Sequence, residues 1–344
     1  MKPHVRMLAE WERTEYLLVA LPNSATDWEY ILEEAREQYG RLLNAFVKAG
    51  QKVLVLCRDR SEVISLTGGE NELIIPVEIP YNDTWTRDYG PLTVEKEDRI
   101  RVLDFGFNGW GLKFSSDRDN LVNLNLNLKK IFSERSYSNQ RDFELEGGSV
   151  ETDGAGTLLT TTRCLTSPNR NGGKGKGELN EILLQRLGMD HILWLDYGYL
   201  AGDDTDSHID TLARLAPGNT ILFVGCRNMD DEHFEELLKM RAQLSMFKNK
   251  TGEPYNLVEL PMPDPIFDEN GDRLPATYAN YLVCNDFIFM PTYGQSANDQ
   301  LACQTIRIAY PDHKVIPVDC TVLIKQHGSL HCATMQIPYG VISF

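Results

Sequence analysis

An acidic stretch in the second half of the chain holds the residue types of an acid–base site. Residues 202–210 read Gly-Asp-Asp-Thr-Asp-Ser-His-Ile-Asp, with four carboxylates and one imidazole. Side chains alternate along an extended chain, so an extended segment would place His208 and Asp210 on the same face. The stretch therefore offers an imidazole for proton transfer with a carboxylate beside it.

Three interpretations of this acidic stretch remain open when it is taken alone. Asp and Ser favour turns, so it could be a solvated loop. Spaced carboxylates also ligate Ca²⁺ or Mg²⁺, although the glycine and glutamate positions of an EF-hand loop are missing here. The third interpretation is a site for a cationic organic substrate, with His208 as the acid and base.

A second candidate segment, residues 82–91, brings an aromatic, a cationic and an acidic side chain close together before a Gly-Pro turn. As a structural corner, it would bury Trp85 in the core and pair Arg87 with Asp88. The spacing alone favours this structural interpretation. The functional alternative is an aromatic wall for a bound cation, with Asp88 as its counter-ion.

Glu146 precedes two glycines, Gly147 and Gly148. Glycines let the backbone approach a ligand closely, so Glu146 could reach into a pocket. Taken alone, the segment is more typical of a β-turn or bulge. Both interpretations stay open at this point.

The glycine-rich residues 169–177 superficially suggest a phosphate-binding loop. Glu178 follows the last glycine, where the Walker pattern requires Lys and then Ser or Thr. We therefore expect a flexible lid or a surface loop before a helix.

Cys332, next to His331, is the candidate nucleophile among seven cysteines. Most single cysteines are small core residues, and the other six lie mostly in or beside apolar strand-like segments. A nucleophilic cysteine needs a setting that ionises it and a base from elsewhere in the chain. His208 could be that base, since Cys and His residues distant in sequence often meet in the fold.

The composition excludes several classes of protein. The chain has 344 residues, 42% hydrophobic, and a formal net charge of −16. An acidic field disfavours nucleic acid and concentrates cations instead. No window approaches the roughly 20 apolar residues of a membrane span, and residues 1–6 lead into no signal-peptide core. No cysteine pair has metal or redox spacing. We expect a cytoplasmic protein.

The apolar patterning alternates short strands with single helices along the whole chain. About five strand-rich units, each with one helix, fill the sequence at a period near one fifth of its length, which is consistent with a radial array. No linker long enough to separate two domains is present, so we expect one domain over 1–344. Expected strands are 15–22, 52–56, 73–79, 91–95, 100–107, 157–161, 192–195, 219–224, 257–260, 279–284, 286–290, 314–318 and 322–324; expected helices are 28–49, 119–134, 178–187, 230–246 and 296–309.

Together the motifs resemble the agmatine deiminase branch of the guanidino-group-modifying (pentein) superfamily over nearly the whole chain. Six motifs occur in order, which is far more specific than any one of them. They are Trp85-x-Arg87-Asp88-x-Gly90-Pro91, Glu146-Gly147-Gly148 with Asp153-Gly154-x-Gly156-Thr157, Cys164-x-x-x-Pro168-Asn169-Arg170-Asn171, Gly202-Asp203-x-Thr205-Asp206-x-His208-Ile209-Asp210, Leu274-Pro275-Ala276-x-Tyr278-x-Asn280, and His331-Cys332-x-Thr334-x-Gln336-x-Pro338. The resemblance implies an α/β fold, a five-bladed pseudo-symmetric propeller of ββαβ units.

The resemblance also implies how a guanidinium would be held. This planar cation suits bidentate carboxylates, here Asp88 and Asp210. Trp85 would cover its guanidinium or alkyl part, and Asp204 would meet the ammonium at the far end.

The chemical step follows from the same resemblance. Cys332 would attack to form a covalent amidino-thioether, while His208 protonates the leaving ammonia and then activates water. Glu146 would hydrogen-bond His208 or the substrate nitrogens. No metal or organic cofactor is expected.

The implied activity is hydrolysis of agmatine to N-carbamoylputrescine and ammonia, a step of putrescine and polyamine biosynthesis. A peptidyl-arginine or other guanidine deiminase is the first alternative, and a non-catalytic cation-binding pentein is the second. The expected partner is a small cationic guanidine, with no nucleic acid, no membrane and a possible homo-oligomer. The chain departs from the family pattern at Ser207 and at 328–330, which bears on the substrate's tail, and keeps Leu21-Pro22 where the family commonly has Trp-Pro.

Overall fold

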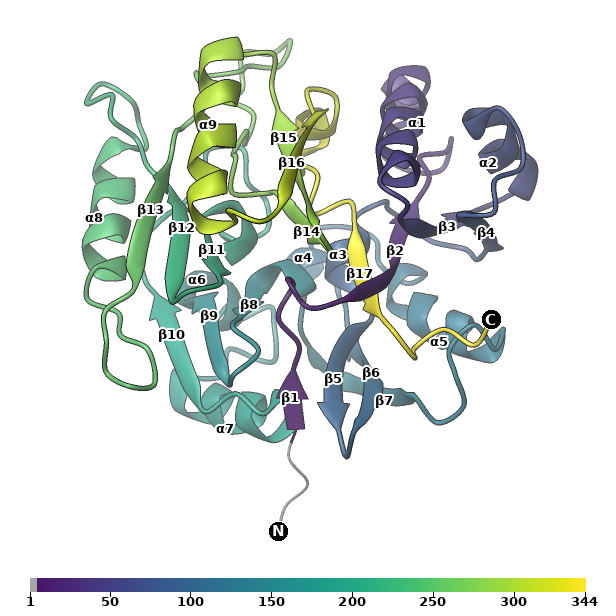
Figure 1. Ribbon diagram of the computed structural model, residues 1–344, viewed down its shortest axis with the longest axis horizontal. Coiled ribbons are helices and arrows are strands. Elements are labelled where there is room, and N and C mark those ends of the chain that lie inside the picture. The colour runs from purple at the N-terminus through teal and green to yellow at the C-terminus, as the bar shows by residue number, and fades with distance from the viewer. Residues whose placement is uncertain (1–4) are drawn as a thin grey trace.

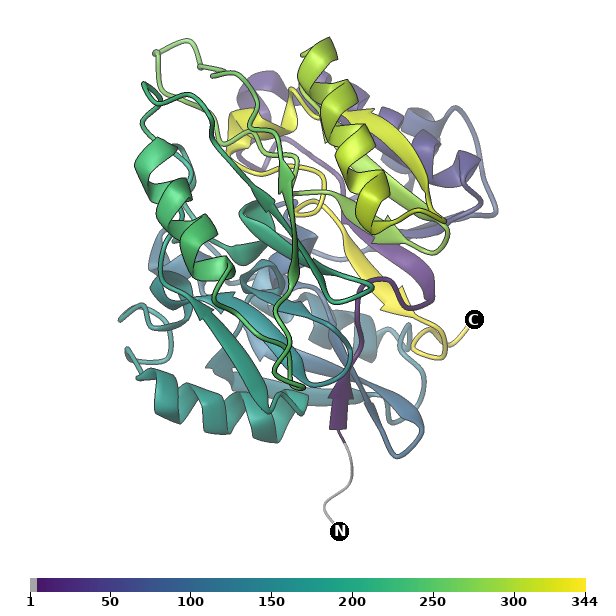
Figure 2. The same cartoon turned by 60° about the vertical axis from the view of Figure 1, so that its left-hand side comes forward.

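The computed structural model describes residues 5–344, so the expectation for the first four residues lies outside it. Within that range the strands form five sheets arranged around the centre of the molecule (Figure 1). Figure 2 shows α7, α8 and α9, coloured teal, green and yellow-green, on the outer faces of their sheets. The strand ends and connecting loops meet near the middle, where the functional residues lie.

Two of the sheets have four strands and three have three strands. Their strand orders are β17 (Met335–Pro338), β2 (Thr14–Ala20), β3 (Lys52–Cys57), β4 (Ile74–Glu78); β1 (Val5–Met7), β5 (Leu92–Lys96), β6 (Arg99–Gly106), β7 (Tyr137–Glu144); β10 (His191–Leu195), β9 (Thr157–Thr161), β8 (Val150–Thr152); β11 (Ala213–Ala216), β12 (Thr220–Val224), β13 (Asn256–Leu260); and β14 (Leu282–Cys284), β15 (Phe287–Thr292), β16 (Lys314–Asp319).

One main α-helix connects the second and third strands of each ββαβ unit, with a length between 7 residues for α5 and 17 for α1. The α-helices are α1 (Leu32–Lys48), α2 (Arg60–Thr67), α3 (Thr86–Tyr89), α4 (Gly109–Leu112), α5 (Val122–Leu128), α6 (Thr162–Leu165), α7 (Lys176–Leu187), α8 (Phe234–Leu244) and α9 (Ser296–Ala309). The 3-10 helices are η1 (Glu29–Ile31), η2 (Asp119–Leu121), η3 (Gly147–Ser149), η4 (Ile209–Thr211) and η5 (Leu323–Gln326).

One connection repeats in each of the five sheets and confirms the predicted ββαβ unit. An antiparallel strand pair is followed by a helix and then by a strand parallel to the second one, as in β11, β12, α8 and β13. In the first unit the leading strand is β17, from the opposite end of the chain, which pairs antiparallel with β2. This pairing closes the ring and confirms the pentein fold class.

Some expected elements differ from the structure. The strand expected at 322–324 is part of the 3-10 helix η5. A short apolar run is buried equally well in a strand or a helical turn, so periodicity does not distinguish them. The helices α2, α3, α4 and α6 and the strands β1, β7, β8, β11 and β17 were not predicted. The helix expected at 119–134 is η2 followed by α5 and ends at Leu128, whereas α9 has the predicted bounds.

The core lies between each sheet and its helix. Residues 17–20 of β2 are fully buried, because the strand lies inside its sheet and is covered on both faces. The sequence of such a strand is a continuous apolar run and does not alternate between apolar and polar residues. None of the helices described within residues 5–344 has the length and apolar character needed to cross a membrane.

Candidate active site

A cavity of about 140 Å³ opens near the centre of the molecule. It combines acidic, aromatic and thiol side chains from segments that are far apart in the sequence. Its lining residues are Asp27, Asp83, Trp85, Asp88, Trp110, Phe114, Asp204, Thr205, Thr211, Gln326, His327, Gly328 and Cys332. Four predicted site residues therefore line one cavity, namely Trp85, Asp88, Asp204 and Cys332.

The short helix α3 divides its charged side chains between two directions. Asp88 faces the cavity, where its carboxylate accepts hydrogen bonds from the Gly148 amide at 2.9 Å and from Trp110 Nε1 at 2.8 Å. Arg87 instead pairs with Glu10 at 3.1 Å. The expected Arg87–Asp88 ion pair is therefore wrong, because adjacent residues on a helical turn do not face each other. Trp110 was not predicted.

Asp88 is held in an acidic and buried setting. Burial raises the pKa of Asp88 to about 6; His208 opposes this, while the charges of Asp210 and Glu146 add to it. A cation placed beside Asp88 would relieve this repulsion and favour the ionised carboxylate.

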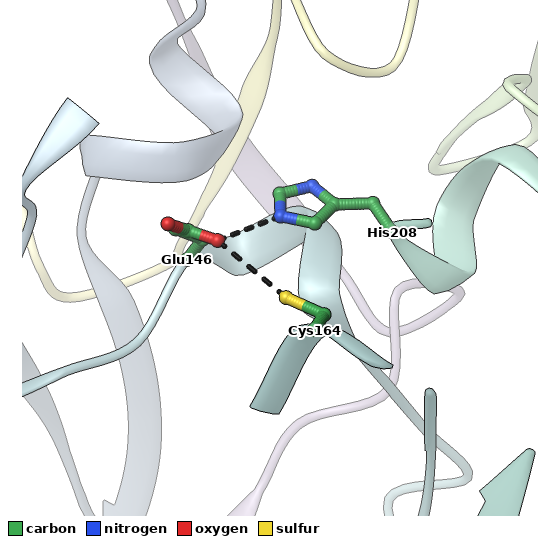
Figure 3. A group of neighbouring side chains, drawn as sticks. All are labelled: Glu146, Cys164 and His208. Carbon is green, nitrogen blue, oxygen red and sulfur yellow. Dashed lines mark hydrogen bonds and ion pairs between the residues drawn. The ribbon is translucent and has the colours of Figure 1, made fainter. Parts of the chain in front are cut away.

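His208 and Asp210 are fully buried, but the segment between them is not extended as expected. His208 precedes η4, and Asp206 and Ser207 before it have positive φ values of 68° and 65°. This backbone turns His208 toward Glu146, whose Oε2 lies 2.7 Å from its Nε2 (Figure 3). On the other side of the ring, Nδ1 lies 3.5 Å from Asp88 Oδ1.

The carboxylates around His208 favour its protonated form. Burial lowers the pKa of His208, but the charge of Asp88, the neighbouring Cys164 and the hydrogen bond to Glu146 outweigh burial and raise that pKa well above its ordinary value. The ring is therefore an imidazolium at neutral pH, ready to donate a proton.

Glu146 is held in place by Arg170, a residue that we singled out only as part of a family motif. Arg170 Nε lies 2.9 and 3.0 Å from the two carboxylate oxygens of Glu146. The Nη1 atom of Arg170 lies 2.5 Å from Asp206 Oδ2. Although the 169–177 segment is a loop before α7, its Arg170 is buried, so it is not wholly a surface loop. Burial raises the pKa of Glu146, but hydrogen bonding to His208 and the charge of Arg170 lower it overall.

The thiol of Cys332 contacts the side chains of Asp210 and Asn280. Its Sγ lies 3.6 Å from Asp210 Oδ2 and accepts a hydrogen bond from Asn280 Nδ2 at 3.3 Å. Burial and the charges of Asp210 and Asp88 raise the pKa of Cys332 well above its ordinary value. Without a bound cation, Cys332 is a thiol.

A buried network of ion pairs holds the Asp210 carboxylate in place. His331 lies 2.7 Å from Asp210 through Nδ1 and 2.6 Å from Glu10 through Nε2. Glu10 is paired in turn with Arg87 and Arg214. Neither Glu10 nor Arg214 was predicted, because their partners are distant in sequence and only the fold brings them together.

The carboxylates of residues 202–210 contact different partners and do not converge on one ion site. Asp203 accepts hydrogen bonds from Thr205 and from the Ser207 amide, while Asp206 pairs with Arg170. Asp204 lines the cavity and Asp210 lies against His331. Neither the solvated turn nor the hard-cation site describes this arrangement.

Within residues 5–344, one cluster has ligand atoms close enough for a metal ion, and it consists of Glu146, Cys164 and His208 (Figure 3). Cys164 Sγ lies 3.7 Å from Glu146 Oε2. Arg170 already contacts both oxygens of Glu146, and its positive charge opposes a metal cation there. The cluster is therefore better suited to holding the His208 proton than to holding a metal.

Gly148 lets the acidic groups converge. A β-carbon at this position would lie 2.7 Å from His208 Nδ1, 2.8 Å from Asp88 Oδ1 and 3.1 Å from Asp210 Oδ2. Three reactive groups thus surround one point on the backbone. A side chain there would push them apart.

We expect Gly148→Ala to lower kcat/KM by about 100-fold, because displacing catalytic groups by about 1 Å has an effect of that size. The measurement is steady-state kinetics with a thermal unfolding curve for each variant. Gly177→Ala is the matched control, since a β-carbon at Gly177 in α7 meets nothing within 4 Å. Equal kinetics for Gly148→Ala and the control would contradict this role of Gly148.

The far half of the cavity is also acidic. Burial raises the pKa of Asp83 to about 7, and the charges of Asp27, Asp204 and Asp88 add to this effect. Burial likewise raises the pKa of Asp204, while His327 opposes the rise. The cavity therefore carries unfavourable negative charge until a cation enters.

Asp83 makes a testable contribution to stability. Its pKa is about 7 in the folded protein and 3.8 in an unperturbed side chain, so its favourable contribution is complete below pH 4 and is lost as pH rises through about 7. The loss amounts to at most about 4 kcal/mol. We expect Asp83→Asn to raise the melting temperature at pH 8.5 and not at pH 4, as measured by scanning calorimetry. A similar gain from exposed Asp230→Asn would contradict this explanation.

Comparison with known proteins identifies the family of this chain. A family model described as Porphyromonas-type peptidyl-arginine deiminase matches residues 6–338. This chain belongs to that family.

Solved structures and curated proteins with similar chains carry two kinds of description. A Porphyromonas gingivalis structure described as "Putative Arginine Deiminase" is 42% identical, with TM-score 0.92, and the match covers 98% of this chain and 100% of that chain. A C. jejuni agmatine deiminase, solved as a cysteine-to-serine variant with substrate bound, is 36% identical, with TM-score 0.90 and coverage of 99% and 98%. A Legionella pneumophila protein named "Putative agmatine deiminase" is 32% identical, with coverage of 96% and 94%.

Proposed function

We propose that the protein is an agmatine deiminase, which hydrolyses agmatine to N-carbamoylputrescine and ammonia in the synthesis of putrescine. The whole chain, 1–344, forms one catalytic unit, because residues from its beginning, middle and end contribute to the site. The observation that carries the proposal is an acidic cavity lined by the Cys332 thiol and several carboxylates, with the imidazole of His208 buried beside Asp88.

The inner end of the cavity fits a guanidinium. Asp210 Oδ1 is buried without a hydrogen-bond partner. Buried polar atoms are rarely left unpaired, so this carboxylate oxygen is positioned for a ligand. A guanidinium has five N–H donors in one plane and would pair with Asp210 and Asp88 while Trp85 covers its face.

The outer end of the cavity fits an ammonium. Asp27, Asp83 and Asp204 line it, and none of them forms an ion pair with Lys or Arg within the described chain. Lys113 pairs with Asp206 instead, at 2.8 Å. The terminal amine of agmatine would meet Asp204, whereas the carboxylate of free arginine would meet like charge.

Substrate binding would activate the nucleophile. The guanidinium charge offsets the negative charges of Asp88 and Asp210 that keep Cys332 protonated, so the thiol releases its proton to solvent. The thiolate then forms a bond to the guanidinium carbon. The carbon–nitrogen bond breaks as His208 gives its proton to the leaving ammonia, and an amidino-thioether remains on Cys332.

Hydrolysis of this intermediate returns the enzyme to its starting state. Neutral His208 takes a proton from water, and the hydroxide attacks the amidine carbon. The carbon–sulfur bond breaks as the hydroxyl proton of the adduct passes to the departing Cys332 thiolate. The thiol re-forms, and a ureido product leaves. Glu146 is the positioning residue for His208, because it fixes the ring through Nε2 and stabilises the imidazolium that forms again.

An arginine or peptidyl-arginine deiminase is the second candidate. It is favoured by the 42% identity to the Porphyromonas gingivalis protein, which exceeds the 36% identity to the C. jejuni agmatine deiminase. The inner half of the site would serve either substrate. The acidic outer half supports agmatine.

The deciding experiment measures ammonia and ureido product from agmatine, free arginine and an arginine-containing peptide. We expect turnover of agmatine, with kcat/KM for arginine lower by at least about 100-fold, since a carboxylate beside Asp204 costs several kcal/mol. Preference for arginine or peptide would reject agmatine and keep the chemistry. No turnover of all three would favour a non-catalytic cation-binding protein.

The pH dependence follows from Asp88. Only the ionised carboxylate pairs with a guanidinium, and its pKa is about 6 in the free protein. We expect kcat/KM for agmatine to fall about tenfold for each pH unit below this value. A pH profile that stays flat through that range would contradict the role of Asp88.

Two expectations from the sequence remain predictions. The cytoplasmic location is tested by cell fractionation, and the possible homo-oligomer by light scattering of the purified protein.

A further inference from the structure

His327 is a lining residue of the cavity that the mechanism above does not use. It follows η5, is exposed, and lines the cavity together with Asp27 and Asp204. Its backbone has a φ of 64°, in the left-handed region that favours glycine. A left-handed residue is common at the end of a helix, so the side-chain contact of His327, and not its backbone conformation, indicates its role.

One hydrogen bond assigns the tautomer of His327. Its Nδ1 lies 2.7 Å from the carbonyl oxygen of Gly202. A carbonyl oxygen only accepts hydrogen bonds, so Nδ1 carries the hydrogen and donates it. In the neutral ring, Nε2 is therefore left as an acceptor on a side chain that lines the cavity.

The same hydrogen bond ties two cavity loops together. Gly202 begins the acidic stretch that carries Asp204, and His327 begins the loop that leads to Cys332. Next to His327, Gly328 packs on Trp85, since a β-carbon there would lie 2.5 Å from the indole ring. The position of the imidazole is thus fixed relative to both ends of the cavity.

We propose that His327 is a specificity-determining residue, whose Nε2 accepts a hydrogen bond from the terminal ammonium of the substrate beside Asp204. This inference rests on the proposed function, because agmatine carries a guanidinium at one end and an ammonium at the other. An acceptor at this place strengthens binding of a substrate with two cationic ends. It gives no advantage to a guanidine that ends in a methyl group.

The test compares agmatine with n-butylguanidine, which is agmatine without its terminal amine. Both are assayed with the unaltered enzyme, H327G and H327N. Glycine accepts the left-handed backbone without strain, while asparagine tolerates it and keeps a short polar side chain. The two variants therefore separate the imidazole from the backbone geometry.

We expect kcat/KM for agmatine to fall about tenfold in both variants, the effect of losing one hydrogen bond to a charged group. The kcat/KM for n-butylguanidine should fall by less than that for agmatine, because losing the hydrogen bond to Gly202 affects both substrates alike. Equal losses for both substrates, or no loss for agmatine, would overturn the inference while deimination stands. Absence of turnover by the unaltered enzyme would instead overturn the proposed function, and the inference with it.

Discussion

Replacing Cys332 by serine is expected to lower kcat for agmatine by at least about 10⁴-fold, because removal of the nucleophile is among the most damaging changes to covalent catalysis. Serine keeps the size of the side chain, but its hydroxyl does not ionise beside Asp210 and Asp88. The fold should be unaffected, since serine is close to cysteine in size and Sγ of Cys332 contacts the polar side chains of Asn280 and Asp210. Ammonia release and a thermal unfolding curve measure the two effects.

The C332S variant should still bind agmatine, because the carboxylates that hold the guanidinium remain. Isothermal titration calorimetry measures this binding directly. The matched control is Cys226→Ser, a half-buried thiol whose Sγ bonds only the Asn228 carbonyl and which should retain full activity. A C332S enzyme with substantial turnover would remove Cys332 from the mechanism.

The second large effect is expected for His208→Gln. Loss of a general acid and base lowers rates by about 10²–10⁴-fold, and His208 would act in both halves of the reaction. Removing the imidazolium also leaves Asp88 and Glu146 without a positive charge between them. We therefore expect a loss of kcat together with a higher KM, both from steady-state kinetics.

The control for His208→Gln is His313→Gln, a partly exposed histidine on the loop between α9 and β16. Equal kinetics for the two variants would contradict the assignment of His208. A loss confined to KM would also contradict it, because a group that only binds substrate would leave kcat unchanged.

The repeating fold was predictable because the local apolar patterning of the sequence indicates each strand and helix. Five alternations of apolar strands and one helix predicted the ββαβ units, and α9 has the expected bounds. The ring closure was not predictable in the same way. The strand β17 is only four residues long and pairs with β2 near the other end of the chain, so its structure depends on a partner that local patterning does not reveal.

In the candidate site, too, some residues were predictable from the sequence and others depend on partners that only the fold brings close. The resemblance named Trp85, Asp88, Asp204 and Cys332, which line the cavity, but not Asp27 or Asp83, which also line it. Arg170, Glu10 and Trp110 were missed as site residues because each acts through a partner distant in sequence. Arg170, for example, lies in a glycine-rich loop that suggests flexibility, and only its contact with Glu146 explains its burial.

The geometry at His208 differed from the expectation for a specific reason. Alternation along a strand would have placed His208 and Asp210 on one face, but positive φ values at Asp206 and Ser207 redirect the chain into η4. Both side chains still reach the site, through a 3-10 turn instead of a strand. Nothing in the residue spacing distinguishes these two routes.

The most direct test asks which sulfur carries the intermediate. Two thiols lie near the acid–base groups: Cys332, which lines the cavity, and Cys164, which lies beside Glu146 and His208. Acid quenching during turnover of agmatine, followed by mass spectrometry of the digested protein, measures the site of the adduct. The mechanism predicts agmatine minus ammonia on the peptide that contains Cys332. An adduct on Cys164, or turnover with no adduct at any time point, would contradict it.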